Sequence, residues 1–255
     1  MYNKANEYFR EFMSRFNTSD EKIAHKMEHT YYVVENAKYI CEGLGLDETN
    51  TDIAMVIALL HDIGRFPQAT EMKTFREDIT NYDHATLGVK ILFEQNEIRN
   101  FIDTDKYDDI IRVAIANHSN YILDTTGFTE EQILHSKIIR DADKIDSFRA
   151  KVVDDVYTMA NIYPEDIENS LITDIVFDTF MNEKTILRTD RKTAIDIWVS
   201  YIAFLFGLEF SCSYKLIKEK DYINQLVDRF DYKQDKDKMN QIRNKALDYL
   251  NKKID

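Results

Sequence analysis

Residues 53–65 read IAMVIALLHDIGR, and this stretch decides the fold. Residues 53–60 are apolar on every side of a helix, which is typical of a helix at the centre of a protein. The run ends on His61 and Asp62, an imidazole beside a carboxylate. Burying such groups is costly unless something compensates. A divalent metal bound by both groups would compensate, and so would a buried hydrogen-bonded pair.

The composition indicates a mostly helical protein with a substantial core. The chain has 255 residues, of which only 6 are glycine and 2 are proline. This length allows one large domain or two small ones. The formal net charge of −13 argues against a nucleic-acid polymer as partner, because such partners require a basic footprint. A small anionic substrate is compatible with this charge if a metal or a local basic group offsets the repulsion.

The sequence gives no sign of a membrane segment or a disulfide framework. Residues 1–16 are amphipathic and charged, without the apolar core of a signal peptide. The most apolar later stretch, 198–208, is much shorter than the roughly 20 residues that cross a bilayer. Cys41 and Cys212 lie far apart in apolar surroundings, which predicts buried free thiols in a reducing compartment. We therefore expect a soluble, cytoplasmic protein.

Hydrophobic periodicity predicts an all-α fold. The expected helices cover, in order, about 3–16, 20–41, the central run around 53–60, 83–97, 106–118 and 130–150. Thr129 and Gln132 form a capping box that predicts the start of the last of these. Residues 66–82 lack a period and are expected to form a loop beside the site. From Pro164 onward three or four more helices are expected, including 194–212 and 236–252.

We find no repeat or linker, so the chain is expected to form a single helical domain over residues 1–255. Its core would cover about 20–150, and C-terminal helices over about 151–255 would pack on it.

The histidines point to shared chemistry in that core. The chain has 6 histidines, at positions 25, 29, 61, 84, 118 and 135. Four of them fall on predicted core-facing helices, and His84 lies one turn before Gly88, where a missing side chain allows close approach. Each alone is compatible with a hydrogen-bonded core residue, and Asp143 alone with a surface charge. Their recurrence on separate helices favours a common metal site.

Three segments of the sequence resemble a known family. They are HTYYVVENA around His29, ALLHDIGRF around His61 and Asp62, and RDADKID around Asp143. Their order and spacing over about residues 20–150 resemble the HD superfamily of metal-dependent phosphohydrolases. The resemblance implies an all-α HD-domain helical bundle with additional C-terminal helices. His25 and His135 match no motif position and are left out of the predicted site.

The resemblance also implies the ligands of one or two divalent metals. His29, His61, Asp62 and Asp143 would bind the first ion, and His84 and His118 the second, with Asp62 between them. This donor set suits manganese, iron, nickel, cobalt or zinc, and magnesium is also compatible. A metal can lower the pKa of a water molecule and so generate a nucleophile near neutral pH. Asp62, Arg65 and Lys144 are the expected catalytic residues, the last two as contacts for substrate phosphate.

The substrate is expected to be a small phosphoester, with a nucleotide as first choice. The GYP-containing stretch of the cyclic-di-GMP phosphodiesterases is absent. Arg65 and Phe66 replace the acidic pair of the alarmone hydrolases, and the histidine that follows His-Asp-Ile-Gly in deoxynucleotide triphosphohydrolases is missing. Two alternatives stay open: a di-iron oxygenase with the same six ligands, and a non-catalytic metal-binding signalling module. The oligomeric state does not follow from the sequence.

Overall fold

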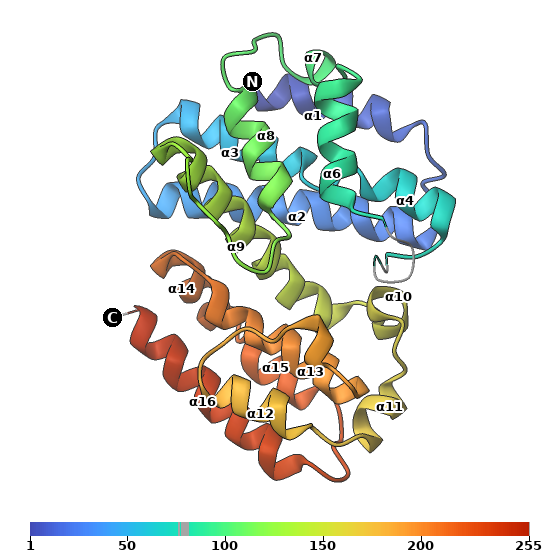
Figure 1. Ribbon diagram of the computed structural model, residues 1–255, viewed down its shortest axis with the longest axis vertical. Helices are drawn as coiled ribbons and strands as arrows, with labels where there is room; N and C mark the ends of the chain where they lie inside the picture. Colours follow the sequence, from blue (N-terminus) through green and yellow to red (C-terminus); the bar gives the residue numbers. More distant parts are fainter. Residues whose placement is uncertain (76, 78–81, 255) are drawn as a thin grey trace. The chain divides into compact units, whose positions relative to one another are not determined.

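A computed structural model describes residues 1–75, 77 and 82–254 of the chain. Every regular element in this part is a helix, so the all-α prediction is confirmed (Figure 1). The chain divides into two compact units, Met1–Asp143 and Lys144–Asp255. The single-domain organisation with packed C-terminal helices stays a prediction.

The first unit is built from helices that follow one another through short connections. They are α1 (Tyr2–Met13), α2 (Glu21–Gly43), α3 (Glu48–Leu60), α4 (Arg65–Met72), α6 (His84–Val89), the π-helical turn η1 (Lys90–Glu94), α7 (Ile98–Phe101) and α8 (Asp108–Asn117). The long helix α9 (Glu130–Val153) begins in this unit and continues past its last residue, Asp143.

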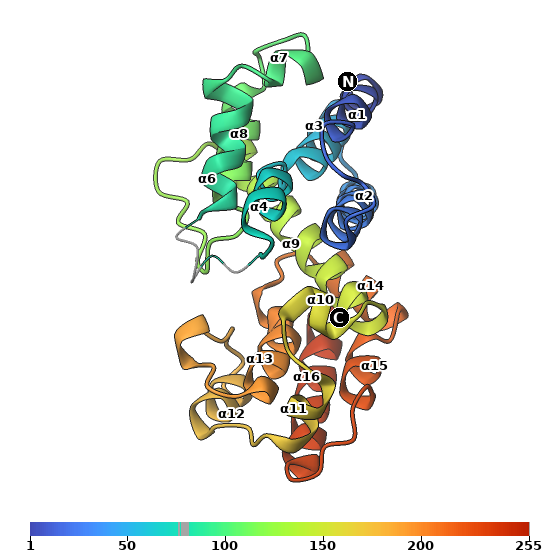
Figure 2. The same ribbon diagram turned by 90° about the vertical axis from the view of Figure 1, so that its right-hand side faces the viewer.

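Helix α3 is the central element of the first unit, as its uniformly apolar sequence predicts. Residues 56–60 are all buried, which leaves no solvent-facing side in the last turn and a half. Helices α1, α2 and α8 all pack against it, while α6 lies beside α8 (Figures 1 and 2). The His-Asp pair at the end of α3 is thereby placed inside the unit.

Two predicted helix starts are confirmed by their caps. Asp20 accepts hydrogen bonds from the backbone N–H groups of Lys22 and Ile23 and so begins α2. At the start of α9, Thr129 Oγ1 accepts from Gln132 N, and Gln132 Oε1 accepts from Thr129 N. This is the reciprocal pairing of a capping box.

The expected loop over 66–82 is wrong in its first part. Residues Arg65–Met72 form helix α4, and Pro67 lies in its first turn. A proline is tolerated there because the first N–H groups of a helix have no partner within it. Pro67 is therefore compatible with the start of a new helix at this point of the chain. Positions 76 and 78–81 of the expected loop lie outside the described residues.

The second unit contains more helices than the sequence predicts. They are α10 (Val156–Ala160), α11 (Pro164–Asn169), α12 (Asp174–Met181), the 3-10 turns η2 (Arg188–Asp190) and η3 (Ala203–Gly207), α13 (Ala194–Ile202), α14 (Ser211–Glu219), α15 (Tyr222–Asp228) and α16 (Lys236–Ile254). Helices α14, α15 and α16 pack against one another (Figure 1). Trp198 is fully buried, and its Nε1–H donates to the carbonyl of Leu226 at 3.2 Å.

The single helix expected over 194–212 is also wrong. Helix α13 tightens into η3 after Ile202, and the extended backbone of Leu208 then separates η3 from α14. The apolar pattern runs through this break because the turn is itself buried at Ala203 and Leu205. Cys212, at the start of α14, is half-buried, whereas Cys41 is buried as expected; neither forms a disulfide.

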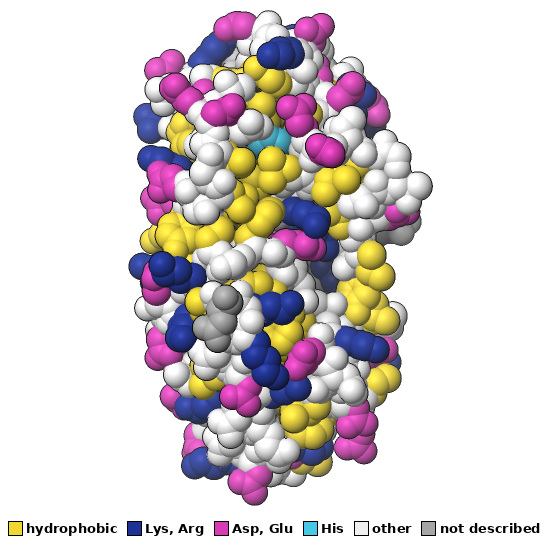
Figure 3. All heavy atoms as spheres, turned by 90° about the vertical axis from the view of Figure 1, so that its left-hand side faces the viewer, with side chains coloured by type: hydrophobic (Ala, Val, Ile, Leu, Met, Phe, Trp, Pro, Cys, Tyr) yellow, Lys and Arg dark blue, Asp and Glu magenta, His cyan; other side chains and the backbone are white. Residues whose placement is uncertain are grey.

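The described helices include none long and apolar enough to cross a membrane. On the face shown in Figure 3, acidic and basic side chains are interspersed.

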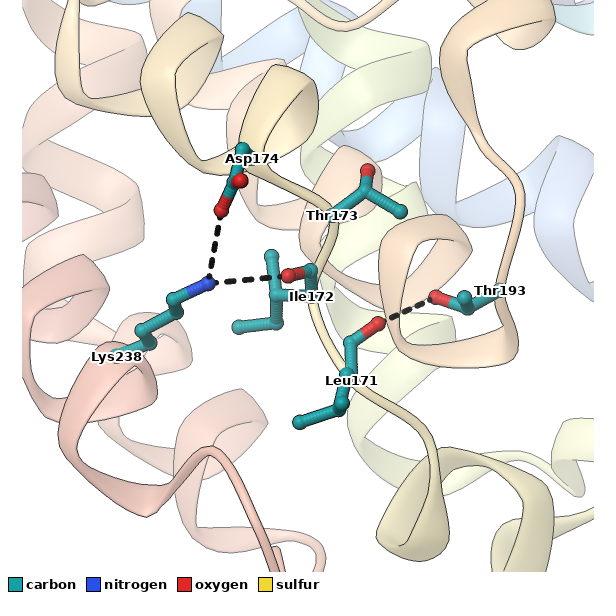
Figure 4. A pocket seen from close by; sticks show the side chains of 6 residues that line it. All are labelled: Leu171, Ile172, Thr173, Asp174, Thr193 and Lys238. Atoms are coloured by element: carbon teal, nitrogen blue, oxygen red, sulfur yellow. Dashed lines mark hydrogen bonds and ion pairs between the residues drawn. The ribbon is translucent and has the colours of Figure 1, made fainter.

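A shallow pocket in the second unit lies where the start of α12 meets α16 (Figure 4). Lys238 donates to the carbonyl of Ile172 at 3.1 Å and lies 3.5 Å from Asp174, while Thr193 donates to the carbonyl of Leu171 at 3.0 Å. These polar groups bond to one another across the pocket wall. The pocket contains none of the predicted site residues.

Candidate metal centre

The turn after α3 brings the His-Asp pair against helix α6. His61 caps α3, and Arg65 N donates to Asp62 O at 2.8 Å, which closes the turn before α4. Gly64 is required for this approach: a Cβ there would lie 2.2 Å from the carbonyl oxygen of His84 and 2.9 Å from Gly88 N. Both contacts are with backbone atoms, which can move only if the helix or the turn shifts. The glycine therefore sets how closely the His-Asp turn approaches α6.

Three predicted ligands from three elements meet on one side of Asp62. His29 Nε2 and His61 Nε2 each lie 3.6 Å from Asp62 Oδ2. Asp143 Oδ1 lies 3.2 Å from His29 Nε2 and 4.0 Å from His61 Nε2. We call this group, with Oδ2 of Asp62, the first half-site. Its members come from α2, the end of α3 and α9.

The remaining two predicted ligands face the other oxygen of Asp62. His84 Nε2 lies 3.2 Å and His118 Nε2 3.6 Å from Asp62 Oδ1. His84 is the first residue of α6, and His118 caps the end of α8. These two histidines and Oδ1 of Asp62 form the second half-site. The structure thus brings all six predicted ligands together, with one carboxylate between two groups.

Backbone contacts fix which nitrogen of each ring faces the site. His61 Nδ1 lies 2.7 Å from the carbonyl of Ala58, and His118 Nδ1 lies 2.7 Å from the carbonyl of Ile115. Because a carbonyl oxygen only accepts, each Nδ1 must carry the proton. In a neutral ring Nε2 is then a lone-pair donor aimed into the site. His84 is oriented in the same way by the carboxylate of Glu77 at its Nδ1.

Two features of these rings fit a bound cation. His61 Nε2 is buried without a hydrogen-bond partner in the described part of the chain. His84 Nε2 and His118 Nε2 lie 2.9 Å apart, although the contacts at both Nδ1 atoms leave each Nε2 as an acceptor. Two facing lone pairs repel unless a proton or a cation lies between them. The donor set therefore fits the divalent metals expected from the sequence.

The ionisation states also suit metal ligation. Burial lowers the pKa of His61 to about 3, because the protonated ring would lose its hydration. Burial alone would raise the pKa of Asp62, but Lys26 and His61 outweigh it and hold this pKa well below its usual value. At neutral pH the centre therefore presents a neutral His61 and an ionised Asp62, the forms that bind metals.

Two residues at the centre were not among those predicted from the sequence. Lys26 Nζ lies 2.6 Å from Asp62 Oδ2. Glu77 accepts from the backbone N–H of His84 at 3.0 Å and lies 3.3 Å from Arg65 Nη1. Lys26 precedes His29 by three residues on α2, a spacing that could have placed it on the ligand face. Glu77 carried no such signal, because it falls in the segment expected to be a loop.

Of the two predicted phosphate contacts, Arg65 lies at the ligand cluster. Its Nε lies 3.7 Å from Asp62 Oδ1, and its Nη1 donates to Gln68 Oε1 at 2.7 Å and to the carbonyl of Phe75 at 3.2 Å. Lys144 follows Asp143 on α9 but belongs to the second unit. There it lies beside Gly207, where an added Cβ would be 3.4 Å from its Cε.

The two excluded histidines lie outside the ligand groups. His135 Nε2 bonds to Asn50 Oδ1 at 3.1 Å, away from Asp62. His25 belongs to none of the groups of described residues that could hold a metal ion.

A helical unit with paired histidine clusters around one aspartate defines a candidate metal-binding domain. Residues 27–147 match the family model of the HD domain, and this part of the chain is an HD domain. The match includes all six predicted ligands, while Lys26 lies one residue before it. No curated protein and no solved structure matches the chain. HD domains bind divalent metals and are generally metal-dependent phosphohydrolases, although non-catalytic members exist.

Proposed function

We propose that the protein is a metal-dependent phosphohydrolase that cleaves a small phosphoester, with nucleotides as the first class to test. The observation that supports this best is the division of the Asp62 carboxylate. Its Oδ2 faces His29 and His61, and its Oδ1 faces His84 and His118. A carboxylate shared in this way can hold two cations close together, which is the usual arrangement for hydrolysis of phosphoesters by two metals.

The six predicted ligands would hold one or two ions of manganese, iron, nickel, cobalt or zinc, with magnesium as a further candidate. A bound divalent cation supplies Lewis acidity, which lowers the pKa of a water molecule and offsets the negative charge of a phosphoryl group. Burial keeps His61 neutral, and the carbonyls of Ala58 and Ile115 hold the Nδ1 atoms of His61 and His118, so that each Nε2 faces the site. The Lys26 ammonium helps to keep Asp62 ionised.

Arg65 is the proposed phosphate contact on the side of the second half-site. Gln68 and the carbonyl of Phe75 hold its Nη1, so the guanidinium is oriented before any substrate arrives. A guanidinium presents several N–H donors in one plane and suits the oxygens of a phosphoryl group. Lys144 stays a proposed second contact, on the evidence of its place after Asp143 in the RDADKID segment.

Elemental analysis of protein purified without added metal tests the proposal, together with phosphate release from nucleotides and simple phosphoesters. About two metals per chain with release of phosphate would support the hydrolase. Two irons with oxygen uptake and no phosphate release would instead indicate the oxygenase alternative. Bound metal without either reaction would favour the non-catalytic module.

A further inference from the structure

The Lys26–Asp62 ion pair places a cation on the oxygen that the first half-site needs. Lys26 Nζ lies 2.6 Å from Asp62 Oδ2, the same atom that faces His29 and His61 at 3.6 Å each. The pair is largely shielded from water, with side-chain exposures of 15% for Lys26 and 4% for Asp62. The Coulomb attraction within such a shielded pair is stronger than within one at the surface.

Resting on the proposed function, we infer that Lys26 is a further substrate-binding residue that a divalent cation releases from Asp62. In the metal-free protein its ammonium occupies Asp62 Oδ2. A divalent cation in the first half-site requires the same oxygen and repels the ammonium. Lys26 then becomes available to a phosphate group of the substrate.

The surroundings of Lys26 keep the released ammonium at the site. Its Nζ lies 5.5 Å from the centre of the Phe75 ring, and the guanidinium carbon of Arg65 lies 5.9 Å from the same ring centre. Lys26 and Arg65 therefore flank one aromatic side chain, with Lys26 on Asp62 Oδ2 and Arg65 nearer Oδ1. The flexible lysine stem can swing while its backbone stays fixed in α2.

This arrangement indicates the charge of the ligand. Three carboxylates of the centre (Asp62, Asp143 and Glu77) face two cationic side chains, Lys26 and Arg65, when no metal is bound. Two added divalent cations would therefore leave the centre with excess positive charge. A phosphate group with two negative charges, as in a phosphomonoester or inorganic phosphate, compensates this excess better than the single charge of a phosphodiester. The inference therefore favours a terminal phosphate as the group that Lys26 binds.

The substitution Lys26→Met separates this role from a structural one, because two affinities should change in opposite directions. Without the competing ammonium, manganese should bind the metal-free protein about tenfold more tightly, within the usual range of coupling between sites. Inorganic phosphate should bind the manganese-loaded variant about tenfold more weakly, because one cationic contact is lost. Isothermal titration calorimetry measures both affinities without any turnover.

Two further variants control the experiment. Lys22→Met removes the same charge one turn earlier on α2, where no described contact joins the lysine side chain to the metal centre, and should leave both affinities unchanged. Lys26→Arg keeps a cation at the position and should recover most of the phosphate affinity. Circular dichroism before and after metal addition shows whether each variant is folded.

The results distinguish this inference from the proposed function. Equal or weaker manganese binding by Lys26→Met would overturn the competition, and unchanged phosphate binding would overturn the substrate contact. If wild-type protein cleaves no phosphoester while the two affinities still move in opposite directions, the proposed hydrolase fails and the role of Lys26 stands. Wild-type protein that binds neither manganese nor any other of the proposed metals would contradict both.

Discussion

Arg140 Nη1 donates to the backbone carbonyl of His118 at 3.1 Å. The same nitrogen also lies 3.0 Å from the carbonyl of Asn117 and 2.6 Å from that of Asn120. The last carbonyls of a helix have no partner within it, so this buried arginine on α9 supplies donors at the end of α8. Arg140 thereby connects the helix of Asp143, in the first half-site, to the backbone of His118, in the second.

Replacing Arg140 with Met should destabilise the fold and weaken the second half-site. Carbonyls at the end of α8 would lose a charged donor, at a cost of about 2–4 kcal/mol in the free energy of unfolding. The backbone carbonyl of His118 would lose its contact with Arg140, so metal should be lost from the second half-site first. Chemical denaturation and metal titration measure the two effects.

Arg112→Met is the matched control for Arg140. Arg112 lies on α8 with 48% of its side chain exposed and pairs with Asp109 at 3.8 Å. Such surface pairs contribute little, so its loss should change the unfolding free energy by under about 1 kcal/mol. Similar destabilisation and metal loss in both variants would contradict the role assigned to Arg140.

Replacing Asp62 with Ala should remove metal from both half-sites and abolish metal-dependent hydrolysis. Each oxygen of Asp62 faces a different pair of histidines, and no other carboxylate described in the centre does so. The measurement is metal content per chain together with phosphate release. His135→Ala should change neither, because His135 bonds to Asn50 and lies outside the cluster. Full activity in Asp62→Ala would refute the proposed function.

Replacing Gly64 with Ala should disrupt the centre without removing any ligand. The added methyl would lie 2.2 Å from the carbonyl oxygen of His84, so either the His-Asp turn or α6 must shift. We expect destabilisation of about 3 kcal/mol or loss of metal from the second half-site. Thermal unfolding with and without manganese tests both.

Gly45→Ala distinguishes a clash from a general effect of losing a glycine. Gly45 has a φ of +66° but open space where a Cβ would lie. It should therefore cost only about 1 kcal/mol, from backbone strain, and leave metal binding unchanged. A larger effect at Gly45 than at Gly64 would show that the backbone contact with His84 is not the constraint.

His135 should make the unfolding free energy depend on pH. Burial lowers the pKa of His135 to about 4, whereas an unfolded histidine titrates near its ordinary value of about 6.5. As pH falls through this window, the unfolded chain takes up a proton that the folded protein does not. Stability is therefore lost on acidification, by up to about 3 kcal/mol from this group.

Denaturant titrations between pH 7 and pH 4, at about one-unit steps, measure this dependence. His135→Gln keeps an amide donor near Asn50 but cannot titrate, so its unfolding free energy should fall less steeply with acid. Equal slopes for wild type and variant would contradict the buried neutral state of His135.

The part of the site that could be predicted from the sequence consists of residues in short sequence motifs. His61 and Asp62 follow an apolar run, and His29, His84, His118 and Asp143 lie on helices whose period is clear. Lys26 could have been found from its spacing to His29. Glu77 could not, because its contact with His84 depends on how a segment without periodicity returns to the start of α6.

The errors in the predicted fold have the same origin. The loop expected around Pro67 begins with a helix, and the helix expected to continue past Ile202 ends there in a buried 3-10 turn. A proline near the end of one helix also fits the start of the next, and a buried 3-10 turn is as apolar as a helix. Local patterns cannot separate these cases, since tertiary packing decides between them.

The division of Asp62 between the half-sites has a consequence for metal supply. The first half-site adds the carboxylate of Asp143, whereas the two histidines of the second are joined by Asp62 Oδ1 alone. Two cations held by the two oxygens of one carboxylate repel each other, so the half-sites would fill in succession as free metal rises. Over a range of free-metal concentrations the protein would hold one ion and not two. Its activity would then depend on how much metal the cell provides.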